Sequence, residues 1–392
     1  MTAGPLNGVR VVEMTMFQQG PVAGMRLGDL GADVIKIEAK TGDPARKFMS
    51  IIGAMSGLKG NNYYFEHTNR NKRSLVLDLK NEQDLAVLKG ELLTYADVMI
   101  ENFRPGVMDR LGLGQEKLRQ VNPRLVTLSV TGFGATGPEA ARTGYDQILQ
   151  VEGGLMSFTG PSADEPTKVG VPIADIVAGM FGAFGVLAAL REREQSGLGQ
   201  QVGTSLLAGQ IAIHSFQGTR WLIAGEIPEP AGNHHPTVCP YGMFRASDSP
   251  IIIAVGNDSI WERFAPLVGI DAQEARFARN RDRVRNRDAL HTMLEAALPE
   301  RRATEWLEVF AHHGVPAGDV RTLDRVYAGG QVRQQGLVCA VEHSTLGSIE
   351  LPGPPLSFDR SSLADHRPPP TLGEHSEALR SELGAAARKR AT

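Results

Sequence analysis

The sequence has little cysteine: Cys239 and Cys339 are the only two among 392 residues. Two isolated thiols fit a reducing compartment, and they exclude both a disulfide scaffold and a cysteine-based zinc site. The opening stretch MTAGPLNGVRVVEM lacks a basic segment followed by an apolar one, so no signal peptide is predicted. Together these absences indicate a cytoplasmic protein.

Clustered positive charge is absent as well. The formal net charge is −3, and no long basic run precedes the terminal ARKRAT. Nucleic-acid-binding proteins carry a concentrated positive field, so no nucleic-acid partner is expected. The histidine pairs at 234–235 and 312–313 lack the helical spacing and the acidic partners of a zinc site, so no metal is expected either.

Uninterrupted hydrophobic stretches are also missing. The longest apolar run, Ile173–Leu190, is broken by Asp175 and three glycines, which predicts a buried helix rather than a membrane span. No membrane partner is therefore expected. Hydrophobic residues make up 42% of the chain and charged residues 22%, which is the balance of a soluble globular protein.

Length and local composition predict the domain organisation. A chain of 392 residues is too long for one ordinary core, which favours two domains or one domain with an insertion. The proline- and glycine-rich stretch 225–242 reads as a linker. We expect residues 1–224 to begin a large domain and residues 225–329 to form the linker and a small domain. Residues 330–392 are too poor in core residues to fold alone and should return to the large domain.

Strand and helix patterns alternate in the first third of the chain. The expected strands are 8–14, 32–38, 73–79, 96–103 and 123–134, and the expected helices begin at Pro21 and Asn81. This alternation is typical of a doubly wound α/β domain with a parallel sheet. The GxGxxG and P-loop fingerprints are absent, although a nucleotide-like ligand can still bind at a helix N-terminus.

The remaining patterns predict further helices and a smaller α+β domain. Residues 179–224 should form two helices joined by a loop at 195–205. The small domain should contain a strand at 251–256 and three helices, near 261–268, 286–298 and 304–313. The predicted fold is thus α/β, with a discontinuous large domain and an inserted small one.

Asp175 admits two interpretations. Asp is a favoured helix N-cap, and a long apolar helix is predicted to follow it at once. The helix start would keep the carboxylate ionised, while its apolar neighbours would oppose the charge. An ionised, poorly hydrated carboxylate can also attack a thioester. The two roles are compatible, and replacing a cap with alanine would cost only about 1 kcal/mol of stability.

A family resemblance favours the reactive role. The stretches GADVIKIE, NRNKRSLVLDLK, ENFRPGVMDRLGL, NPRLVTLSVTGFGATGP, VGVPIADIVAG and LGEHSEAL follow one another across nearly the whole chain. In order and spacing they resemble the class III CoA-transferases, the family of formyl-CoA transferase, carnitine CoA-transferase and α-methylacyl-CoA racemase. The resemblance implies transfer of CoA from an acyl-CoA to a carboxylic acid, with CoA thioesters as substrates and no permanently bound cofactor. It also implies an interlocked homodimer with a Rossmann-like large domain in each chain.

The resemblance also implies the site residues. The catalytic carboxylate falls on Asp175. The CoA contacts fall on Gln18, Gln19, Leu77, Asp78, Leu79, Lys80, Asn102, Phe103, Arg104, Arg110, Thr143, Gly144, Tyr145 and Asp146. Lys40 is a weaker candidate, because many relatives carry arginine directly after KIE, where this chain has Ala39.

Side-chain chemistry supports several of these assignments. Arg104 and Arg110 suit the phosphates of CoA, because a guanidinium binds phosphate oxygens in pairs. Phe103 can contact the adenine or the pantetheine arm. Gln18 is the candidate amide near the reacting carbonyl, where an oxyanion develops. Asp146 is either a site acid or a structural hydrogen-bond partner.

The expected reaction is covalent. Asp175 would form an anhydride with the donor acyl group and then a thioester with CoA. An acyl-CoA racemase is the alternative on the same scaffold, but the racemases carry histidine at the place of Tyr145, and tyrosine, with a pKa of about 10, is a poor base. A non-catalytic CoA-binding protein is the third reading.

Substrate identity stays open. In formyl-CoA transferase a run of glycines closes over the site, and the stretch AGNHHPTVCPYG lacks that run, so formate or oxalate specificity is in doubt. His234 and His235 in this stretch either contact the acyl group or are exposed loop residues, and we favour the second. Succinyl-CoA or another dicarboxylyl-CoA is a plausible donor.

Overall fold

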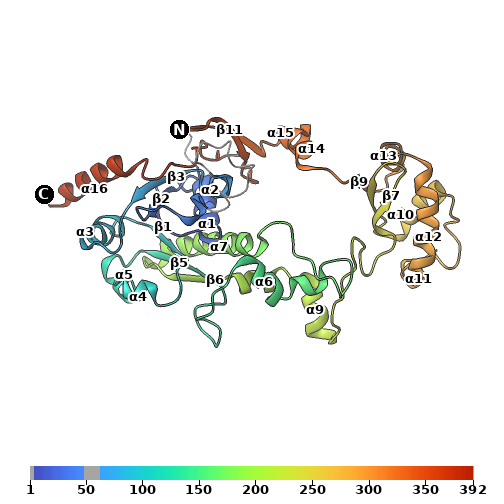
Figure 1. The fold of residues 1–392 in the computed structure, drawn as a ribbon, viewed down its shortest axis with the longest axis horizontal. Coiled ribbons are helices and arrows are strands. Elements are labelled where there is room, and N and C mark those ends of the chain that lie inside the picture. The colour runs from blue at the N-terminus through green and yellow to red at the C-terminus, as the bar shows by residue number, and fades with distance from the viewer. Residues whose placement is uncertain (1–3, 48–61, 392) are drawn as a thin grey trace. The chain divides into compact units, whose positions relative to one another are not determined.

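The computed structural model describes residues 4–47 and 62–391. It contains a parallel six-stranded sheet (Figure 1). The strands are β1 (Arg10–Met14), β2 (Asp33–Glu38), β3 (Lys72–Val76), β4 (Val98–Glu101), β5 (Val126–Thr131) and β6 (Gln201–Ser205), in the order β3-β2-β1-β4-β5-β6. The mixed α/β class with a parallel sheet is confirmed. The order reverses between β1 and β4, and folds of this type bind ligands in the crevice outside the carboxyl ends of the strands at that point.

The same part of the chain contains the helices α1 (Gln19–Asp29), α2 (Tyr63–Asn69), α3 (Glu82–Ala86), α4 (Val107–Arg110), α5 (Gln115–Val121), α6 (Asp146–Glu152), α7 (Ile173–Ser196), α8 (Leu206–Ala212), α9 (Ser215–Ala224), α15 (Gly330–Gln334) and α16 (Ser376–Ala391). Of these, α1, α7 and α8 pack on one face of the sheet and α5 and α16 on the other. Short turns are 3-10 helices η1 (Pro44–Arg46) and η4 (Leu155–Phe158), and α3 continues as a π-helical turn, η3 (Val87–Leu92).

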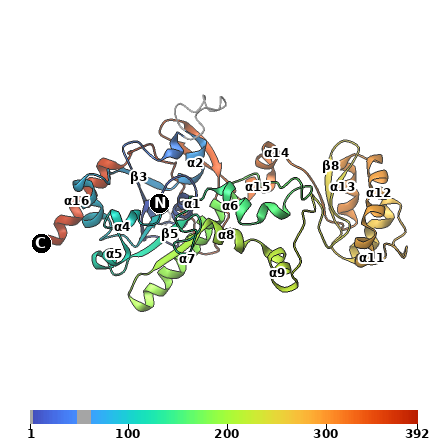
Figure 2. The same cartoon turned by 60° about the horizontal axis from the view of Figure 1, so that its bottom comes forward.

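Two apolar cores hold these layers together. One lies between the sheet and α1, α7 and α8, with Val11, Leu128 and Ala178 at its centre. The other lies on the opposite face, where Leu75 and Leu379 meet under the C-terminal helix. Helix α16 contacts β3 and η3 and lies at one end of the sheet in both views (Figure 1, Figure 2).

Three sequence-based boundaries are wrong. The predicted loop 195–205 contains β6, whose polar residues Gln201 and Thr204 hide its strand character. The strand predicted to end at residue 79 ends at Val76, and residues 77–80 lie in the loop that follows it. The long helix predicted from Asn81 is divided between α3 and η3.

Helix α7 is long and apolar enough to cross a membrane by length and composition alone, and half of its most apolar window is buried inside the protein. It packs closely on α1 because it carries glycine at the contact. A Cβ on Gly179 would lie 2.4 Å from the carbonyl oxygen of Gln19. This contact holds the second turn of α7 against the start of α1.

The chain divides into two compact units. The first comprises residues 1–155, 169–224 and 330–392, and includes an antiparallel hairpin of β10 (Val338–His343) and β11 (Gly347–Pro352). The second comprises residues 156–168 and 225–329.

The second unit has its own sheet and core. Its sheet contains β7 (Tyr241–Arg245), β8 (Pro250–Ala254) and β9 (Ala317–Asp319). Its helices are α10 (Asp258–Phe264), η5 (Ala265–Val268), α11 (Asn280–Arg285), α12 (Arg287–Ala297), η6 (Leu298–Glu300), α13 (Ala303–His312) and α14 (Leu323–Ala328). His234 and His235 are not exposed loop residues: both are partly buried, and the ring of His234 lies 4.5 Å from that of His291.

Candidate active site

Asp175 is the third residue of α7, not its N-cap. Pro172 occupies the cap position, and its side chain makes no capping bond. The helix begins before Asp175 because proline is well tolerated at a helix start. The side chain of Asp146 takes over the capping, and its Oδ1 accepts the backbone N–H of Ala174 at 2.8 Å.

Both carboxylate oxygens of Asp146 therefore accept hydrogen bonds from within the protein. Asp146 begins α6, and its second oxygen, Oδ2, accepts Nε2 of Gln150 at 2.7 Å. Oε1 of Gln150 in turn accepts the backbone N–H of Val169 at 2.9 Å. The carboxylate of Asp146 thus joins the start of α6 to the start of α7, and it adds a fixed negative charge beside Asp175.

The charge state of Asp175 differs from the one expected. Burial, and after it the charge of Asp146, raise the pKa of Asp175 to about 7. Of the two opposing effects expected from the sequence, the helix start and the apolar surroundings, the second prevails, since desolvation and a like charge outweigh the helix N-terminus. Near neutral pH the group exists in both forms. A poorly hydrated carboxylate of this basicity is a better nucleophile than an ordinary surface aspartate.

Tyr64 lies close enough to Asp175 for the two side chains to interact electrostatically, and Gln18 contacts Tyr64. Gln18 is only 2% exposed, and its Oε1 has no hydrogen-bond partner among the described residues. Its amide hydrogen-bonds to the phenol of Tyr64 in α2. Burial, and after it the charge of Asp175, raise the pKa of Tyr64 to about 12, so the phenol stays protonated. Gln19 follows in the first turn of α1, partly buried, and its Oε1 is also without a partner in the described parts of the chain.

Sequence reasoning missed Tyr64. It is separated from Gln18 by 45 residues, and no motif spacing links the two. The packing of α2 against α1 brings them together. A partly buried tyrosine in the short helix before β3 carries no sequence signal that separates it from a packing residue.

A cavity of about 200 Å³ lies at the carboxyl ends of β1, β2 and β3. Predicted site residues form much of its wall: the loop 77–80 and Phe103. Met14 and Ile37, at the ends of their strands, complete an apolar surface. The cavity is thus beside the reversal of strand order, where the topology leads us to expect a ligand.

Other predicted contacts lie around this cavity or away from it. Asn102 uses both ends of its amide on one backbone residue: Nδ2 donates to the carbonyl of Met16 at 2.9 Å, and Oδ1 accepts its N–H at 3.0 Å. Lys40 lines a neighbouring cavity with Arg46 rather than this one.

The remaining predicted contacts are on the surface. Arg104 and Arg110 are exposed and do not belong to the wall of the cavity. Thr143 is exposed, Gly144 packs its backbone against Gly132, and Tyr145 is 62% exposed.

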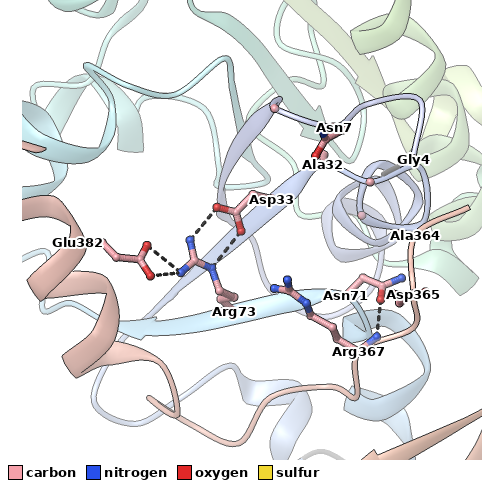
Figure 3. A pocket seen from close by; sticks show the side chains of 13 residues that line it. Gly4, Asn7, Ala32, Asp33, Asn71, Arg73, Ala364, Asp365, Arg367 and Glu382 are labelled. Carbon is pink, nitrogen blue, oxygen red and sulfur yellow. Dashed lines mark hydrogen bonds and ion pairs between the residues drawn. The ribbon is translucent and has the colours of Figure 1, made fainter. Parts of the chain in front are cut away.

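A larger cavity of about 350 Å³ lies at the opposite edge of the sheet, at the amino ends of β2 and β3. Figure 3 shows Arg73 between two carboxylates, forked onto Asp33 at 2.6 and 3.0 Å and bonded to Glu382 at 3.0 Å. The backbone N–H of Arg367 donates to Asn71 at 2.7 Å. None of the predicted site residues lines this cavity.

Comparisons with known proteins agree on one family. The model of CoA-transferase family III matches residues 6–376. Acetyl-CoA:oxalate CoA-transferase of Acetobacter aceti is 38% identical over 97% of this chain and 96% of its own. Succinate–glutarate CoA-transferase of Agrobacterium fabrum is 37% identical over the same shares. The crystal structure of a CAIB/BAIF family protein from Brucella suis superposes with a TM-score of 0.86 at 36% identity, covering 98% of this chain and all of that one.

Proposed function

The chain belongs to CoA-transferase family III, and we propose that Asp175 is the nucleophile on which it transfers CoA between carboxylic acids. Acyl-CoA thioesters and free carboxylic acids are its substrates, as for the family. The observation that carries the proposal is a carboxyl group with its pKa raised to about 7, beside a buried amide and a protonated phenol.

The proposed reaction has four balanced steps. Ionised Asp175 attacks the thioester carbonyl, the C–S bond breaks, and CoA thiolate leaves an aspartyl–acyl anhydride. The thiolate then attacks the aspartyl carbonyl, and the donor carboxylate leaves an aspartyl-CoA thioester. The acceptor carboxylate attacks this thioester and expels the thiolate again. The thiolate finally attacks the acceptor carbonyl, which frees acyl-CoA and Asp175, with no net change in protons.

Gln18 and Tyr64 are suited to stabilise these steps. Every attack develops negative charge on a carbonyl oxygen, and fixed donors near that oxygen lower the barrier. Because the pKa of Tyr64 is raised to about 12, its O–H remains a donor throughout the working pH range. The Gln18 amide is held against that phenol and is almost wholly buried, so it needs little reorganisation when the oxyanion forms.

The cavity beside the strand reversal is the proposed site for the nucleotide end of CoA. Its apolar wall, with Phe103 and Leu77, fits a planar base. Lys80 lines the cavity, and Lys40 is exposed nearby in the loop after β2, so both are available to the phosphates. Arg104, exposed just beyond Phe103, is available at the same edge of the sheet.

The relatives suggest the acids. One is named for oxalate and the other for succinate and glutarate, so we propose that at least one substrate of this enzyme is a dicarboxylate. Incubating the protein with a panel of acyl-CoAs and acids, followed by mass spectrometry of the new thioesters, identifies the pair. A panel in which only monocarboxylates accept CoA contradicts the dicarboxylate proposal.

Hydroxylamine trapping tests the covalent route. Aspartyl anhydride and aspartyl thioester both react with hydroxylamine, so peptide mapping after incubation with acyl-CoA should find the hydroxamate on Asp175. Asp175→Asn should show no label. A label on another residue contradicts the mechanism. A racemase would instead exchange the α-proton of an acyl-CoA with deuterated water in the absence of an acceptor, and exposed Tyr145 is poorly placed for that chemistry.

We also propose that the enzyme is a homodimer. Helices α7 and α9 expose large apolar side chains that a monomer would leave in water. They are Met180, Phe181, Phe184, Trp221, Leu222 and Ile223, between 45% and 82% exposed. Light scattering should give twice the mass of the chain for the wild type and the mass of a single chain for Phe184→Asp. Val121→Asp, on α5, is the matched control and should leave the dimer intact.

A further inference from the structure

Phe17, directly before Gln18, has an unusual backbone conformation. Its φ angle is +62°, in the left-handed region that few residues other than glycine adopt. For a side chain of this size the conformation is strained, because Cβ approaches the following carbonyl oxygen. Such a residue persists only where the surrounding structure holds it in place. The contacts that hold Phe17 therefore also decide where Gln18 points.

Asp43 supplies one of these contacts. Its Oδ1 accepts the backbone N–H of Phe17 at 3.2 Å and that of Ala45 at 2.9 Å. Asp43 is 3% exposed and lies in the loop after β2. On the other side of the β1–α1 loop, Asn102 pairs with both backbone groups of Met16. The two residues that precede Gln18 are thus each fixed by a side chain from a different loop.

Asp43 is in turn fixed by buried charges. Its Oδ2 lies 3.0 Å from Nζ of Lys36, which is wholly buried and also pairs with Glu13 at 3.0 Å. Lys36 donates to the carbonyl of Thr15 at 2.9 Å. Burial alone would lower the pKa of Lys36, but Asp43, Glu13 and then Glu38 together raise it, so the lysine remains charged.

A second buried lysine extends this set of charges under α1. Lys72 pairs with Oε2 of Glu13 at 2.8 Å and donates to the carbonyl of Pro21 at 2.9 Å. Helix α1 makes room for the carboxylate, because a Cβ on Gly24 would lie only 1.8 Å from that oxygen. The charged side chains thus hydrogen-bond to the backbone on both sides of Gln18. Before it they contact Phe17 and Thr15, and after it Pro21.

Stability does not explain so many buried charges. Removing ions from water is costly, and well-packed apolar residues in their place are often as stable or more so. Apolar side chains would, however, leave the N–H of Phe17 and the carbonyl groups of Thr15 and Pro21 without these partners. What the charges provide is a fixed set of hydrogen bonds to the loop that carries Gln18.

We propose that Asp43, held by Lys36, is a positioning residue for the transfer reaction: it fixes Phe17 in its left-handed conformation and so keeps the Gln18 amide beside Tyr64 and Asp175. The inference rests on the proposed function of that site. It predicts that the effect of Asp43 on kcat depends on Gln18.

Hydrogen–deuterium exchange tests the positioning without any activity. Asp43→Ala removes the acceptor for Phe17, so the peptide that spans the β1–α1 loop should exchange faster. Asp43→Asn retains an acceptor oxygen and should exchange more slowly than the alanine variant. Asp33→Ala is the matched control: it breaks an ion pair with Arg73 at the opposite edge of the sheet and should leave this loop unchanged. Equal exchange in wild type and Asp43→Ala overturns the inference.

A double-mutant cycle with Gln18 tests the catalytic consequence. In the wild-type background Asp43→Ala should lower kcat about tenfold. In the Gln18→Ala background the same change should lower kcat less than about twofold, because residues that act through one another are not additive. Asp43→Asn should recover part of kcat. An equal loss in both backgrounds overturns the inference, whereas a wild type that transfers no CoA overturns the proposed function and leaves the exchange result to decide the positioning.

Substitutions at Phe17 decide the matter if Asp43→Ala does not fold. Glycine adopts the left-handed conformation freely and keeps the N–H, so Phe17→Gly should keep kcat within about twofold of wild type. Proline lacks the N–H and fixes φ near −65°, so Phe17→Pro should lose as much kcat as Gln18→Ala. A proline variant as active as the glycine variant overturns the inference.

Discussion

Replacing Asp175 with asparagine should stabilise the protein at alkaline pH while abolishing transfer. The pKa of Asp175 is raised from its ordinary 3.8 to about 7. Between these two values the native protein holds a proton that the unfolded chain releases. Stability therefore falls as the pH rises from about 4 to about 7, because ionising this carboxyl is harder in the folded state. Asparagine has no proton to lose and is free of this penalty.

The size of the effect follows from the shift. About 3 pKa units correspond to about 4 kcal/mol as an upper limit. Asp175 is partly exposed, and solvent screening reduces this to about 2 kcal/mol. In a protein of this length, that raises Tm by about 2–4 °C. This reverses the effect expected for an N-cap, whose loss would cost about 1 kcal/mol.

Scanning calorimetry at pH 4 and pH 8, at one fixed protomer concentration, measures the difference. The Tm of Asp175→Asn relative to wild type should increase by those few degrees between pH 4 and pH 8. Asp164→Asn, at an exposed position, is the control and should shift Tm equally at both pH values. A difference between Asp175→Asn and wild type that is the same at both pH values, or that favours wild type at pH 8, refutes the reasoning.

Three further predictions concern the same site. The rate constant kcat/KM should rise with pH through an apparent pKa near 7, because only ionised Asp175 attacks; a flat initial-rate profile between pH 5.5 and 8.5 contradicts this. Tyr64→Phe should lower kcat by about 10–100-fold with little change in Tm, because it removes one donor near the oxyanion. The control, Tyr63→Phe, changes the neighbouring tyrosine, which is 47% exposed, and should be active in the same steady-state assay. Gly179→Ala should lower both Tm and kcat, because its Cβ would lie 2.4 Å from the α1 backbone. The control is Gly203→Ala, whose Cβ would have no atom within 4 Å and which should lower kcat in the same assay by less than about twofold.

The strands of the sheet were predictable where burial is continuous. Strands β1 and β2 combine valine and isoleucine with only a few charged residues between turn residues, and a strand buried on both faces is rich in such apolar residues. Strand β6 is different, because it lies at the edge of the sheet and its burial alternates, with Gln201 exposed and Val202 partly buried. Its sequence, QVGTS, does not distinguish an edge strand from a loop.

Which residues belong to the site was easier to predict from the sequence than the charge states of those residues. The sequence points to Asp175 and Gln18, but it does not show that α7 starts three residues earlier than the cap reading requires. The pKa of Asp175 depends on burial and on Asp146, which is 29 positions away along the chain. Tyr64 comes from yet another helix. Such contacts are set by the packing of α1, α2, α6 and α7, and no local pattern contains them.

Glu38 and Asp175, both in the large unit, carry carboxyl groups with opposite pKa shifts, and we assign them different roles. Burial would raise the pKa of Glu38, but the guanidinium of Arg46, followed by Lys36, lowers it to about 2, so this group stays ionised and paired. Asp175 is also crowded by its neighbours, yet no cation of the described residues offsets that burial, and its pKa rises to about 7. Opposite pKa shifts in two carboxyl groups mark different roles. The paired one holds loops in place, whereas the unpaired one retains the basicity that an attack on a thioester requires.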